Sequence, residues 1–494
     1  MDDLDLDLPA TPVAGLLPYG FARRHGVLRQ NGHIAHRATT PLEALLEVQR
    51  VGGPAAFASV TDGAFETQLR AQYRDTASDA AEFAAAADTD LNALANSAAA
   101  VDDLLDSRDD SPVIRLINAL LLEAVKDGAS DIHVETQERR CVVRFRIDGV
   151  LRDMIEPARA LAPLLISRIK VMARLDIAEK RVPQDGRVSL RVGGHEVDVR
   201  VSTLPAQHGE RVVLRLLDRD ATQLDLNNVG MSARDVATFG NMLARPHGMV
   251  LVTGPTGSGK TTTLYAALNR LNDRKRNIMT VEDPIEYELE GVGQMQVNPR
   301  IELTFARGLR AILRQDPDVI MVGEIRDHET AEMAVRSSMT GHFVLTTLHT
   351  NSAVGSVTRL IDMGVERYLL APMVVGLIAQ RLVRKLCDVC RAPGHATAIE
   401  AGLLGDALTE GAPLYRAAGC AACHSEGYRG RTAIYELIEV DEAMQLLIHD
   451  GASEAQLTAA ARARAPGLLD DGIAKIAAGV TSVEEIARVV READ

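Results

Sequence analysis

The 494-residue sequence contains no tryptophan, only 3% aromatic residues and only five cysteines. Because many nucleic-acid-binding proteins stack bases on aromatic side chains, this scarcity argues against nucleic acid as the main partner. Hydrophobic residues make up 46% of the chain, yet no run approaches the roughly 18 to 20 apolar residues of a membrane-spanning helix. The first ten residues, MDDLDLDLPA, are acidic where a secretory signal is basic and then apolar. We therefore expect a cytoplasmic chain that reaches a membrane only through a partner.

The formal net charge of -14 is unevenly distributed along the chain. Between Arg74 and Asp110 there are ten Asp or Glu residues and two Arg residues, which gives this segment a net charge of -8. A protein that binds a polyanion needs a basic face. The charge therefore also argues against nucleic acid, although the nearly neutral remainder could carry a local basic patch.

The length of the chain favours about three domains, because a single hydrophobic core stops growing well below this size. The N-terminal part favours a small mixed domain, with a short helical start in LPYGFARRHGVLRQ and a helix in PLEALLEVQRVGG. An acidic, Ala-rich stretch then reads as a linker of partial helicity. The predicted segments are an N-terminal domain at 1–73, the linker at 74–110, an α+β domain at 111–220, a core at 221–380, a cysteine-bearing subdomain at 381–435 and a helical segment at 436–494.

Two different hydrophobic patterns follow Ser111. SPVIRLINALLLEAVKDG has apolar residues at helical spacing and stops at Gly128, which predicts an amphipathic helix. Apolar and polar residues then alternate around Asp-Gly and Gly-Gly turns, which predicts antiparallel strands. The alternating runs are CVVRFRIDGVLRDMI, RVSLRVGGHEVDVRVSTL and ERVVLRLLDR. Further on, the apolar strands GMVLVTG, NIMTVED, DVIMVGE and HFVLTTL alternate with helical segments. This second pattern is typical of a parallel sheet covered on both faces, so we expect an α/β multidomain fold.

The sequence GPTGSGKT, residues 254–261, lies between an apolar strand and a helical segment. Glycines in such a loop let backbone N–H groups face phosphate oxygens, and the helix N-terminus adds partial positive charge. Lys260 would reach the β- and γ-phosphates, and the Thr261 hydroxyl would bind Mg²⁺. A flexible glycine turn would leave the Lys-Thr pair unexplained. The predicted nucleotide-binding residues are Gly254, Pro255, Thr256, Gly257, Ser258, Gly259, Lys260, Thr261 and Thr262.

Acids and histidines stand at the ends of the later strands. NIMTV ends in Glu282, and DVIMV is followed by Gly323 and Glu324. Such positions lie beside the phosphate loop in parallel sheets, so we assign Glu282 as the water-activating base and Glu324 as a metal-linked acid. The alternative is two ordinary strand-end acids. His342 and His349 flank the strand FVLTTL, and they could sense the γ-phosphate or be satisfied core histidines.

Four of the five cysteines form two pairs, Cys387-x-x-Cys390 and Cys420-x-x-Cys423, separated by 29 residues. Two chelating pairs of thiolates have the composition of a closed, tetrahedral zinc site, whose role is structural. A redox disulfide pair and a nucleic-acid zinc ribbon are the alternatives. Cys141 lies within a strand pattern, and we expect it to be packed in a core.

The segments GPTGSGKTTT, TVEDPIEY, LRQDPDVIMVGEIRD and TGHFVLTTLHTN resemble, in order and spacing, the Walker A, Asp box, Walker B and His box of the secretion ATPase superfamily. The resemblance implies a RecA-like P-loop ATPase core that uses ATP and Mg²⁺ and assembles as a homo-hexamer. It also implies that Glu282 and Glu324 are the essential carboxylates, and that His342 and His349 belong to a nucleotide site at a subunit interface.

The segments SDIHVE, RFRIDGVL, RVPQDGR, VDVRVSTLP and HGERVVLRLLD resemble the α+β, PAS-like domain that precedes the core in the same family. In that family, arginines approach the nucleotide as the two domains close and act as arginine fingers. For each arginine, the alternative is an ordinary solvated or ion-paired position. The candidates implied by the resemblance are Arg187, Arg200 and Arg211, and also Arg307, Arg310 and Arg314.

The four cysteines resemble the zinc element of type II secretion and pilus-assembly ATPases, which the pilus-retraction branch lacks. LLPYGFARRHGVL, residues 16–28, resembles the opening of the type II secretion ATPases (GspE family). That resemblance implies a motor that hydrolyses ATP to ADP and phosphate to drive pseudopilus assembly and protein export. It also implies that residues 1–73 bind the cytoplasmic part of an inner-membrane platform protein. The alternatives are a type IV pilus assembly ATPase, a nucleic-acid translocase and a scaffold that binds ATP without useful hydrolysis.

Overall fold

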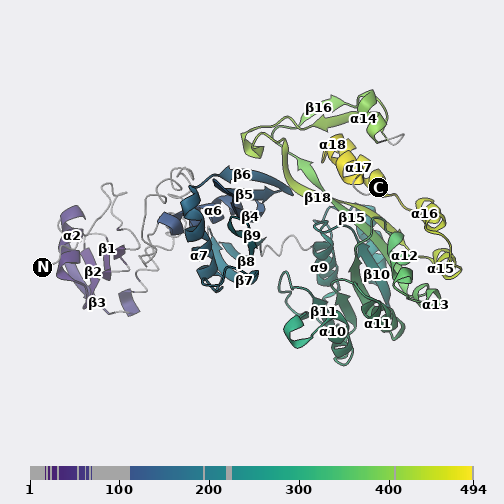
Figure 1. Cartoon of the computed structure of the whole chain (residues 1–494), viewed down its shortest axis with the longest axis horizontal. Coiled ribbons are helices and arrows are strands. Elements are labelled where there is room, and N and C mark those ends of the chain that lie inside the picture. Colours follow the sequence, from purple (N-terminus) through teal and green to yellow (C-terminus); the bar gives the residue numbers. More distant parts are fainter. Residues whose placement is uncertain are drawn as a thin grey trace. The chain divides into compact units, whose positions relative to one another are not determined.

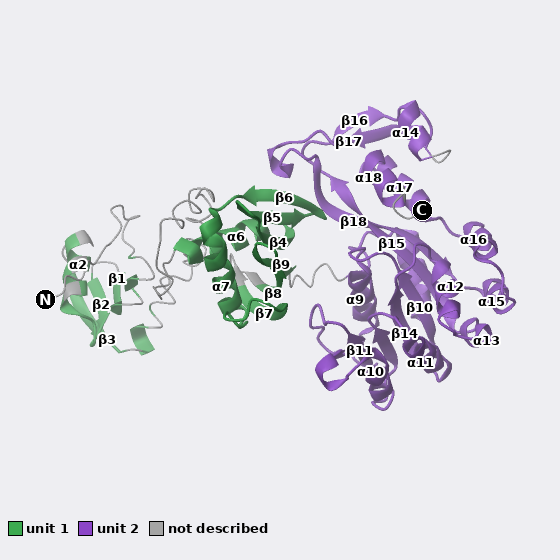
Figure 2. Ribbon diagram, in the orientation of Figure 1, with its two compact units in different colours: residues 1–218 green, residues 219–494 purple. Residues whose placement is uncertain are grey.

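The computed structural model divides the chain into two compact units, residues 1–218 and 219–494 (Figures 1 and 2). The predicted linker at 74–110 lies outside the described residues, as do residues 16, 18–20 and 23–24 of LLPYGFARRHGVL. The predicted domain boundaries remain predictions. The structure describes residues 17, 21–22, 25–30, 33–52, 55–61, 63–65, 68, 112–192, 195–218, 225–404 and 408–491.

Near the N-terminus, three strands and a helix form a small α+β fold. β1 (Val27–Gln30) pairs antiparallel with β2 (His33–Arg37), which pairs parallel with β3 (Ala56–Val60). α2 (Leu42–Gly52) connects β2 to β3, which confirms the helix predicted in PLEALLEVQRVGG. In LPYGFARRHGVLRQ, where a short helical start is predicted, the last four residues VLRQ form β1, and the apolar side chains of Val27 and Leu28 are buried in the sheet.

Residues 112–218 form a six-stranded antiparallel sheet with the order β6-β5-β4-β9-β8-β7. α6 (Pro112–Lys126) is the predicted amphipathic helix, and it is followed by Gly128 with a φ of +63°. α6 and α7 (Ala162–Met172) share one hydrophobic core with the inward-facing strand residues, which confirms the α+β domain. The strands are β4 (Ala129–Thr136), β5 (Cys141–Ile147), β6 (Val150–Ile155), β7 (Gln184–Val192), β8 (His195–Ala206) and β9 (Gly209–Asp218).

The second unit is built on a seven-stranded sheet with the order β12-β11-β13-β14-β10-β15-β18. All neighbours are parallel except β15 and β18, so the predicted parallel core is confirmed. Met249 and Leu251 pack toward α10, α11 and α12, whereas Val250 and Val252 pack toward α8 and α9. The bounds are α8 (Ala233–Leu243), β10 (Gly248–Thr253), α9 (Lys260–Leu271), β11 (Ile278–Glu282), β12 (Gly293–Gln296), α10 (Phe305–Ile312), β13 (Val319–Val322), α11 (His328–Met339), β14 (Phe343–Leu348), α12 (Gly355–Asp362) and α13 (Arg367–Leu370).

The four clustered cysteines lie in an excursion between two strands of this same sheet. β15 (Val374–Leu386) and β18 (Tyr428–Glu439) pair antiparallel, and residues 387–427 connect them. The excursion contains β16 (Ala392–His395), α14 (Ala398–Leu403) and β17 (Pro413–Arg416). Four helices follow: α15 (Glu442–His449), α16 (Glu454–Arg462), α17 (Leu468–Ala477) and α18 (Val483–Arg491). None of the helices in the described ranges has the length and apolar character needed to cross a membrane.

Candidate nucleotide site and metal centre

The loop at residues 254–259 connects β10 to α9, the strand–loop–helix arrangement that the motif predicts. Gly254 has a φ of +151° and Gly259 a φ of +86°, values that side chains rarely adopt. A Cβ atom at Gly254 would lie 2.5 Å from the Gln380 carbonyl oxygen, and one at Gly259 would lie 2.8 Å from Gln380 Nε2. The loop therefore lies so close to β15 that only glycine fits at these two positions.

The Lys260 side chain folds back over this loop. Its Nζ donates to the carbonyl oxygens of Gly254 at 2.7 Å and Pro255 at 3.1 Å. Burial lowers the pKa of Lys260 to about 8, although the Glu324 carboxylate acts in the opposite direction. Within the described residues, the buried Ser258 hydroxyl has no hydrogen-bond partner. A glycine cradle, a lysine held over it and an unpartnered buried hydroxyl fit the phosphates of a nucleotide.

Two polar residues in the middle of β15 contact the phosphate loop or its surroundings, and sequence analysis missed both. Gln380 Nε2 donates to the Ser258 carbonyl oxygen at 2.7 Å, and its Oε1 accepts from Thr263 Oγ1 at 2.8 Å. Arg381, which is 5% exposed, donates to the Asn351 carbonyl oxygen at 2.8 Å. The signal that could have found them is a Gln-Arg pair interrupting the apolar run VVGLIA, since buried polar groups need specific partners.

Glu324 and His349 come together at the carboxyl edge of the sheet. The Glu324 carboxylate lies 3.3 Å from His349 Nε2 and accepts from Arg326 Nη2 at 2.5 Å. Arg326 Nη1 also lies 4.0 Å from the Asp283 carboxylate. β14 runs parallel to β10 with Leu348 opposite Thr253, so the acid–histidine cluster lies at the edge of the sheet where the phosphate loop begins, and the charge of Glu324 acts on Lys260. This position suits a carboxylate that supports a metal ion or its bound waters.

His342 lies at the other end of β14 from His349. Its Nδ1 lies 2.9 Å from the Ser337 carbonyl oxygen and 3.1 Å from Thr340 Oγ1. β14 runs parallel to β10, so His342 is at the edge of the sheet opposite the phosphate loop, about 20 Å from His349 at the rise of a strand. Within one chain, the structure does not bring His342 to the other predicted site residues.

Glu282 ends β11 and is 2% exposed. Its carboxylate accepts hydrogen bonds from Thr280, Tyr265 and Gln294. Burial raises the pKa of Glu282, and the three hydrogen bonds oppose that rise. Gly323 packs against this strand end, since a Cβ there would lie 3.4 Å from the Glu282 Cα.

The arginines predicted from the preceding domain share one face of its sheet. Arg187, Arg200 and Arg211 alternate with strand residues that are buried in the core, so they lie on the face away from α6 and α7. Arg187 forms an ion pair with Asp198 at 2.8 Å, and Arg211 forms one with Glu135 at 2.6 Å. These contacts match the ion-paired alternative.

The three arginines at α10 also have partners within the core unit. Arg307 lies 3.3 Å from the Glu302 carboxylate, and Arg310 pairs with Glu329. Arg314 donates to the Arg310 carbonyl oxygen at 2.8 Å. Within the described residues, none of the three forms a hydrogen bond or ion pair with the phosphate loop.

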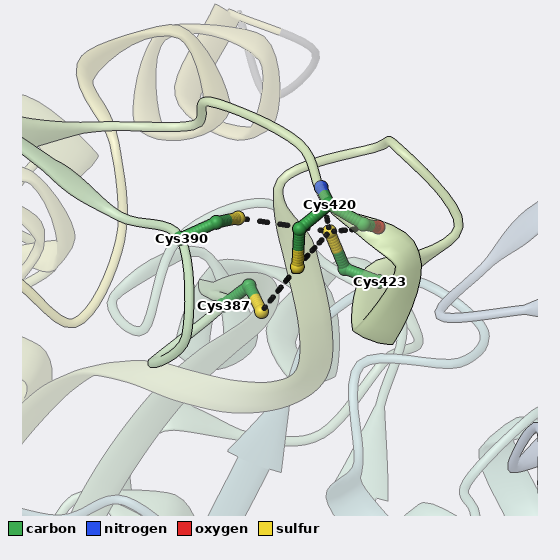
Figure 3. Close-up of side chains that lie close together, drawn as sticks. All are labelled: Cys387, Cys390, Cys420 and Cys423. Carbon is green, nitrogen blue, oxygen red and sulfur yellow. Dashed lines mark hydrogen bonds between the residues drawn. The ribbon is translucent and has the colours of Figure 1, made fainter.

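Cys387, Cys390, Cys420 and Cys423 converge on one point, as Figure 3 shows. Their sulfur atoms all lie within 4.8 Å of one another, and the closest pairs are 3.7 Å apart. A zinc–sulfur distance of about 2.3 Å in a tetrahedral site requires sulfur atoms about 3.8 Å apart. The four thiols thus have the spacing of zinc ligands and are too far apart for disulfide bonds of about 2.05 Å.

Backbone N–H groups support the cysteine cluster. Those of Cys420 and Gly427 donate to the Cys423 sulfur at 3.2 and 3.1 Å. Burial raises the pKa of the Cys423 thiol, but hydrogen bonds from these amides and from neighbouring thiols outweigh it and bring the pKa to about 6. A thiolate favoured in this way suits a metal ligand. Cys141 is buried in the core of the six-stranded sheet domain, as predicted.

Together, the parallel sheet, the phosphate loop and the acid–histidine cluster beside Lys260 define a P-loop ATPase. The chain matches the family described as Type II/IV secretion system protein over residues 106–488, and an N-terminal domain of GSPII protein E over residues 16–73. It therefore belongs to the type II secretion ATPase family.

Curated relatives are similar over nearly the whole chain. Type II secretion system protein E of Pseudomonas aeruginosa is 56% identical over 495 residues, which cover 99% of this chain and 98% of the relative. Type II secretion system ATPase E of Vibrio cholerae is 53% identical over 486 residues, which cover 96% of this chain and 97% of the relative.

Solved structures share the fold. The pilus retraction motor PilT with bound ADP is 26% identical, with a TM-score of 0.52, over 76% of this chain and 96% of that chain. The Legionella pneumophila ATPase DotB is 23% identical, with a TM-score of 0.56, over 75% of this chain and 94% of that chain. These structures confirm the RecA-like core and its preceding domain as an ATPase fold.

Proposed function

We propose that this chain is the cytoplasmic motor of a type II secretion system, a homo-hexamer that hydrolyses ATP to ADP and phosphate to drive pseudopilus assembly and protein export. The observation that carries the proposal is the phosphate loop with Glu324 and His349 beside Lys260. The names and near-complete coverage of the relatives support the choice of system.

In the proposed cycle, Lys260 leaves the carbonyl oxygens of its own loop and binds the β- and γ-phosphates of ATP. Ser258 and the backbone N–H groups of the loop complete the cradle. Thr261, assisted by Glu324, would hold Mg²⁺, which neutralises phosphate charge.

Glu282 is the proposed base, which takes a proton from the attacking water. That carboxylate is 2% exposed, so a local opening at the end of β11 has to precede the chemical step. His349 orients Glu324, and His342 acts from a neighbouring subunit, because its own strand places it at the opposite edge of the sheet.

Arg187, Arg200 and Arg211 are the proposed arginine fingers, with Arg307, Arg310 and Arg314 as further candidates. Arg187 and Arg200 lie opposite one another on this sheet face, whereas Arg211 lies opposite Leu204, four residues along β8 from Arg200. Arg187 and Arg211 would exchange carboxylates for phosphate oxygens, and a guanidinium forms charge-assisted, bidentate hydrogen bonds with either group. Loss of one finger should reduce turnover by a factor on the order of 10³ or more.

ATP turnover in Glu324→Gln and Glu282→Gln tests the assignment of the two acids. Both variants should retain nucleotide binding, and turnover should fall by a factor on the order of 10² or more. Glu332→Gln is the matched control, because Glu332 pairs with Arg336 and His328 of its own helix, α11, and with neither Glu324 nor Glu282. Parental turnover in both acid variants would refute the catalytic assignment.

The oligomeric state of the purified chain tests the proposed hexamer. A protein that is monomeric yet fully active would refute the hexameric ring.

Residues 1–73 are proposed to bind the cytoplasmic part of an inner-membrane platform protein and so to recruit the motor to the membrane. The match to an N-terminal domain of GSPII protein E supports this role. Leu42 and Leu46, one helical turn apart on α2, are 65% and 53% exposed and offer an apolar contact. Leu46→Asp should abolish membrane recruitment in cells and leave ATP turnover unchanged. Unchanged recruitment would place the contact elsewhere.

Type IV pilus assembly is the second candidate system, because the cluster of four cysteines resembles an element of pilus-assembly ATPases as well as of type II secretion ATPases. Nucleic-acid translocation is disfavoured by the charge of -14. Equal ATP turnover with and without DNA is expected, and marked stimulation by DNA would revive that candidate.

A further inference from the structure

Glu282 lies in a closed network of neutral donors. Its Oε1 accepts from Thr280 Oγ1 at 2.6 Å and from Gln294 Nε2 at 3.1 Å. Its Oε2 accepts from the Tyr265 hydroxyl at 2.5 Å. Tyr265 belongs to α9, the helix that begins at Lys260, and its side chain is fully buried. One helix therefore carries both the lysine of the phosphate loop and a direct contact to Glu282.

The direction of the tyrosine hydrogen bond is fixed by its other neighbours. The Tyr265 oxygen accepts from the Glu286 backbone N–H at 3.3 Å and from Gln294 Nε2 at 3.4 Å, so its single proton points to Glu282. The amide of Gln294 is oriented in turn, because its Oε1 accepts from the Leu289 N–H at 2.8 Å. The carboxylate of Glu282 thus faces donors only.

We propose that Tyr265 is a positioning residue for catalysis: its hydroxyl holds the Glu282 carboxylate in place and in its ionised form, and couples it to the helix of the phosphate loop. This inference rests on the proposed role of Glu282 as the base. Movement of α9 when nucleotide binds would be transmitted through the same hydrogen bond to the base.

The charged surroundings of Glu282 define the expected pH dependence. From the elements packed against it, Tyr265 and Glu286 are the titratable neighbours, whereas Gln294 and Gly323 are uncharged. Burial and the charge of Glu286 both raise the pKa of Glu282, and the Tyr265 hydrogen bond lowers it. Because a base must be ionised to accept a proton, loss of the hydroxyl should move the acid limb of kcat to higher pH.

The test is the pH profile of kcat and KM for ATP in Tyr265→Phe. We expect the acid limb to shift upward by about one to two pH units, since a hydrogen bond to a charged group is lost. KM should be unchanged, because the hydrogen bonds of the Tyr265 hydroxyl go to Glu282, Glu286 and Gln294 and not to the phosphate loop. Gln294→Met also removes a hydrogen bond to Glu282, so it should shift the acid limb in the same direction. Because Gln294 is less buried than Tyr265, this variant replaces Tyr265→Phe in the test if Tyr265→Phe does not fold. Tyr435→Phe is the matched control, since its buried hydroxyl contacts Thr263 on the same helix but not Glu282.

Glu282→Gln separates failure of this inference from failure of the proposed base. If Glu282→Gln retains turnover, the base itself is misassigned. If Glu282→Gln is inactive but Tyr265→Phe and Gln294→Met keep the parental acid limb, the positioning role is refuted. A Tyr265→Phe variant in which KM rises and the limb stays in place has only a structural defect, and this also overturns the proposal. An equal shift of the limb in Tyr435→Phe would do the same.

Discussion

Gly254→Ala is the perturbation whose effect can be worked out most directly from the phosphate loop. The new Cβ would lie 2.5 Å from the Gln380 carbonyl oxygen and 2.6 Å from Ser258 Oγ. The serine side chain can rotate, but the carbonyl oxygen belongs to the backbone of β15 and is fixed by the sheet. The loop itself must therefore move away from β15.

The expected loss of ATP affinity follows from the free energy needed to return the displaced loop to the position that binds the nucleotide. Restoring the loop to its present position costs about 1 to 3 kcal/mol for such a backbone conflict. At 1.4 kcal/mol per tenfold change, ATP affinity should fall by about 5- to 150-fold. Titration with a fluorescent ATP analogue measures the change.

Gly411→Ala is the control for this prediction, because Gly411 also has a positive φ, +80°, but faces open space. It should lose about 1 to 2 kcal/mol of stability from the unfavourable φ and keep parental ATP affinity. Parental affinity in Gly254→Ala as well would show that the close approach of loop and strand does not matter for binding.

Three further predictions concern zinc, acid stability and a buried ion pair. The purified chain should contain about one zinc ion, measured by atomic absorption, and Cys387→Ser should lose it; a stably folded, zinc-free parent would contradict the site. The hydrogen-bonded pair with Arg416 lowers the pKa of Glu400 to about 2, below the ordinary 4.5, so its stabilisation is present above pH 4.5 and fades between pH 4.5 and 2. Glu400→Gln should remove that dependence in acid denaturation, and an unchanged curve would refute it. Lys170→Met leaves the carboxylate of Glu210 buried without its cation. The free energy of unfolding, measured in urea, should fall by about 3 to 5 kcal/mol, and a fall of less than about 1 kcal/mol would contradict this prediction.

Much of the core could be predicted because its signals are local. The parallel strands are short apolar runs buried on both faces, and glycines, lysine and threonine at fixed spacing specify the phosphate loop between β10 and α9. The cluster of four cysteines could also be predicted, since Cys387 and Cys423 belong to two Cys-x-x-Cys pairs, and this pattern favours a tetrahedral metal site.

Contacts between segments that are far apart in the sequence could not be predicted. Nothing local indicates that β15 and β18 extend the core sheet, so the cysteine segment looked like a separate subdomain. Gln380 approaches the phosphate loop across 122 residues of sequence, and Tyr265 reaches Glu282 across 17. Periodicity reports which face of an element is buried, but it does not identify the partner on that face.

A chromosomal Lys260→Ala substitution, scored in one strain for proteins released to the medium and for pilus-dependent motility, distinguishes type II secretion from pilus assembly. The variant chain must be present at the parental level. We expect lost secretion with normal motility. Lost motility with normal secretion would contradict it and would assign the motor to pilus assembly.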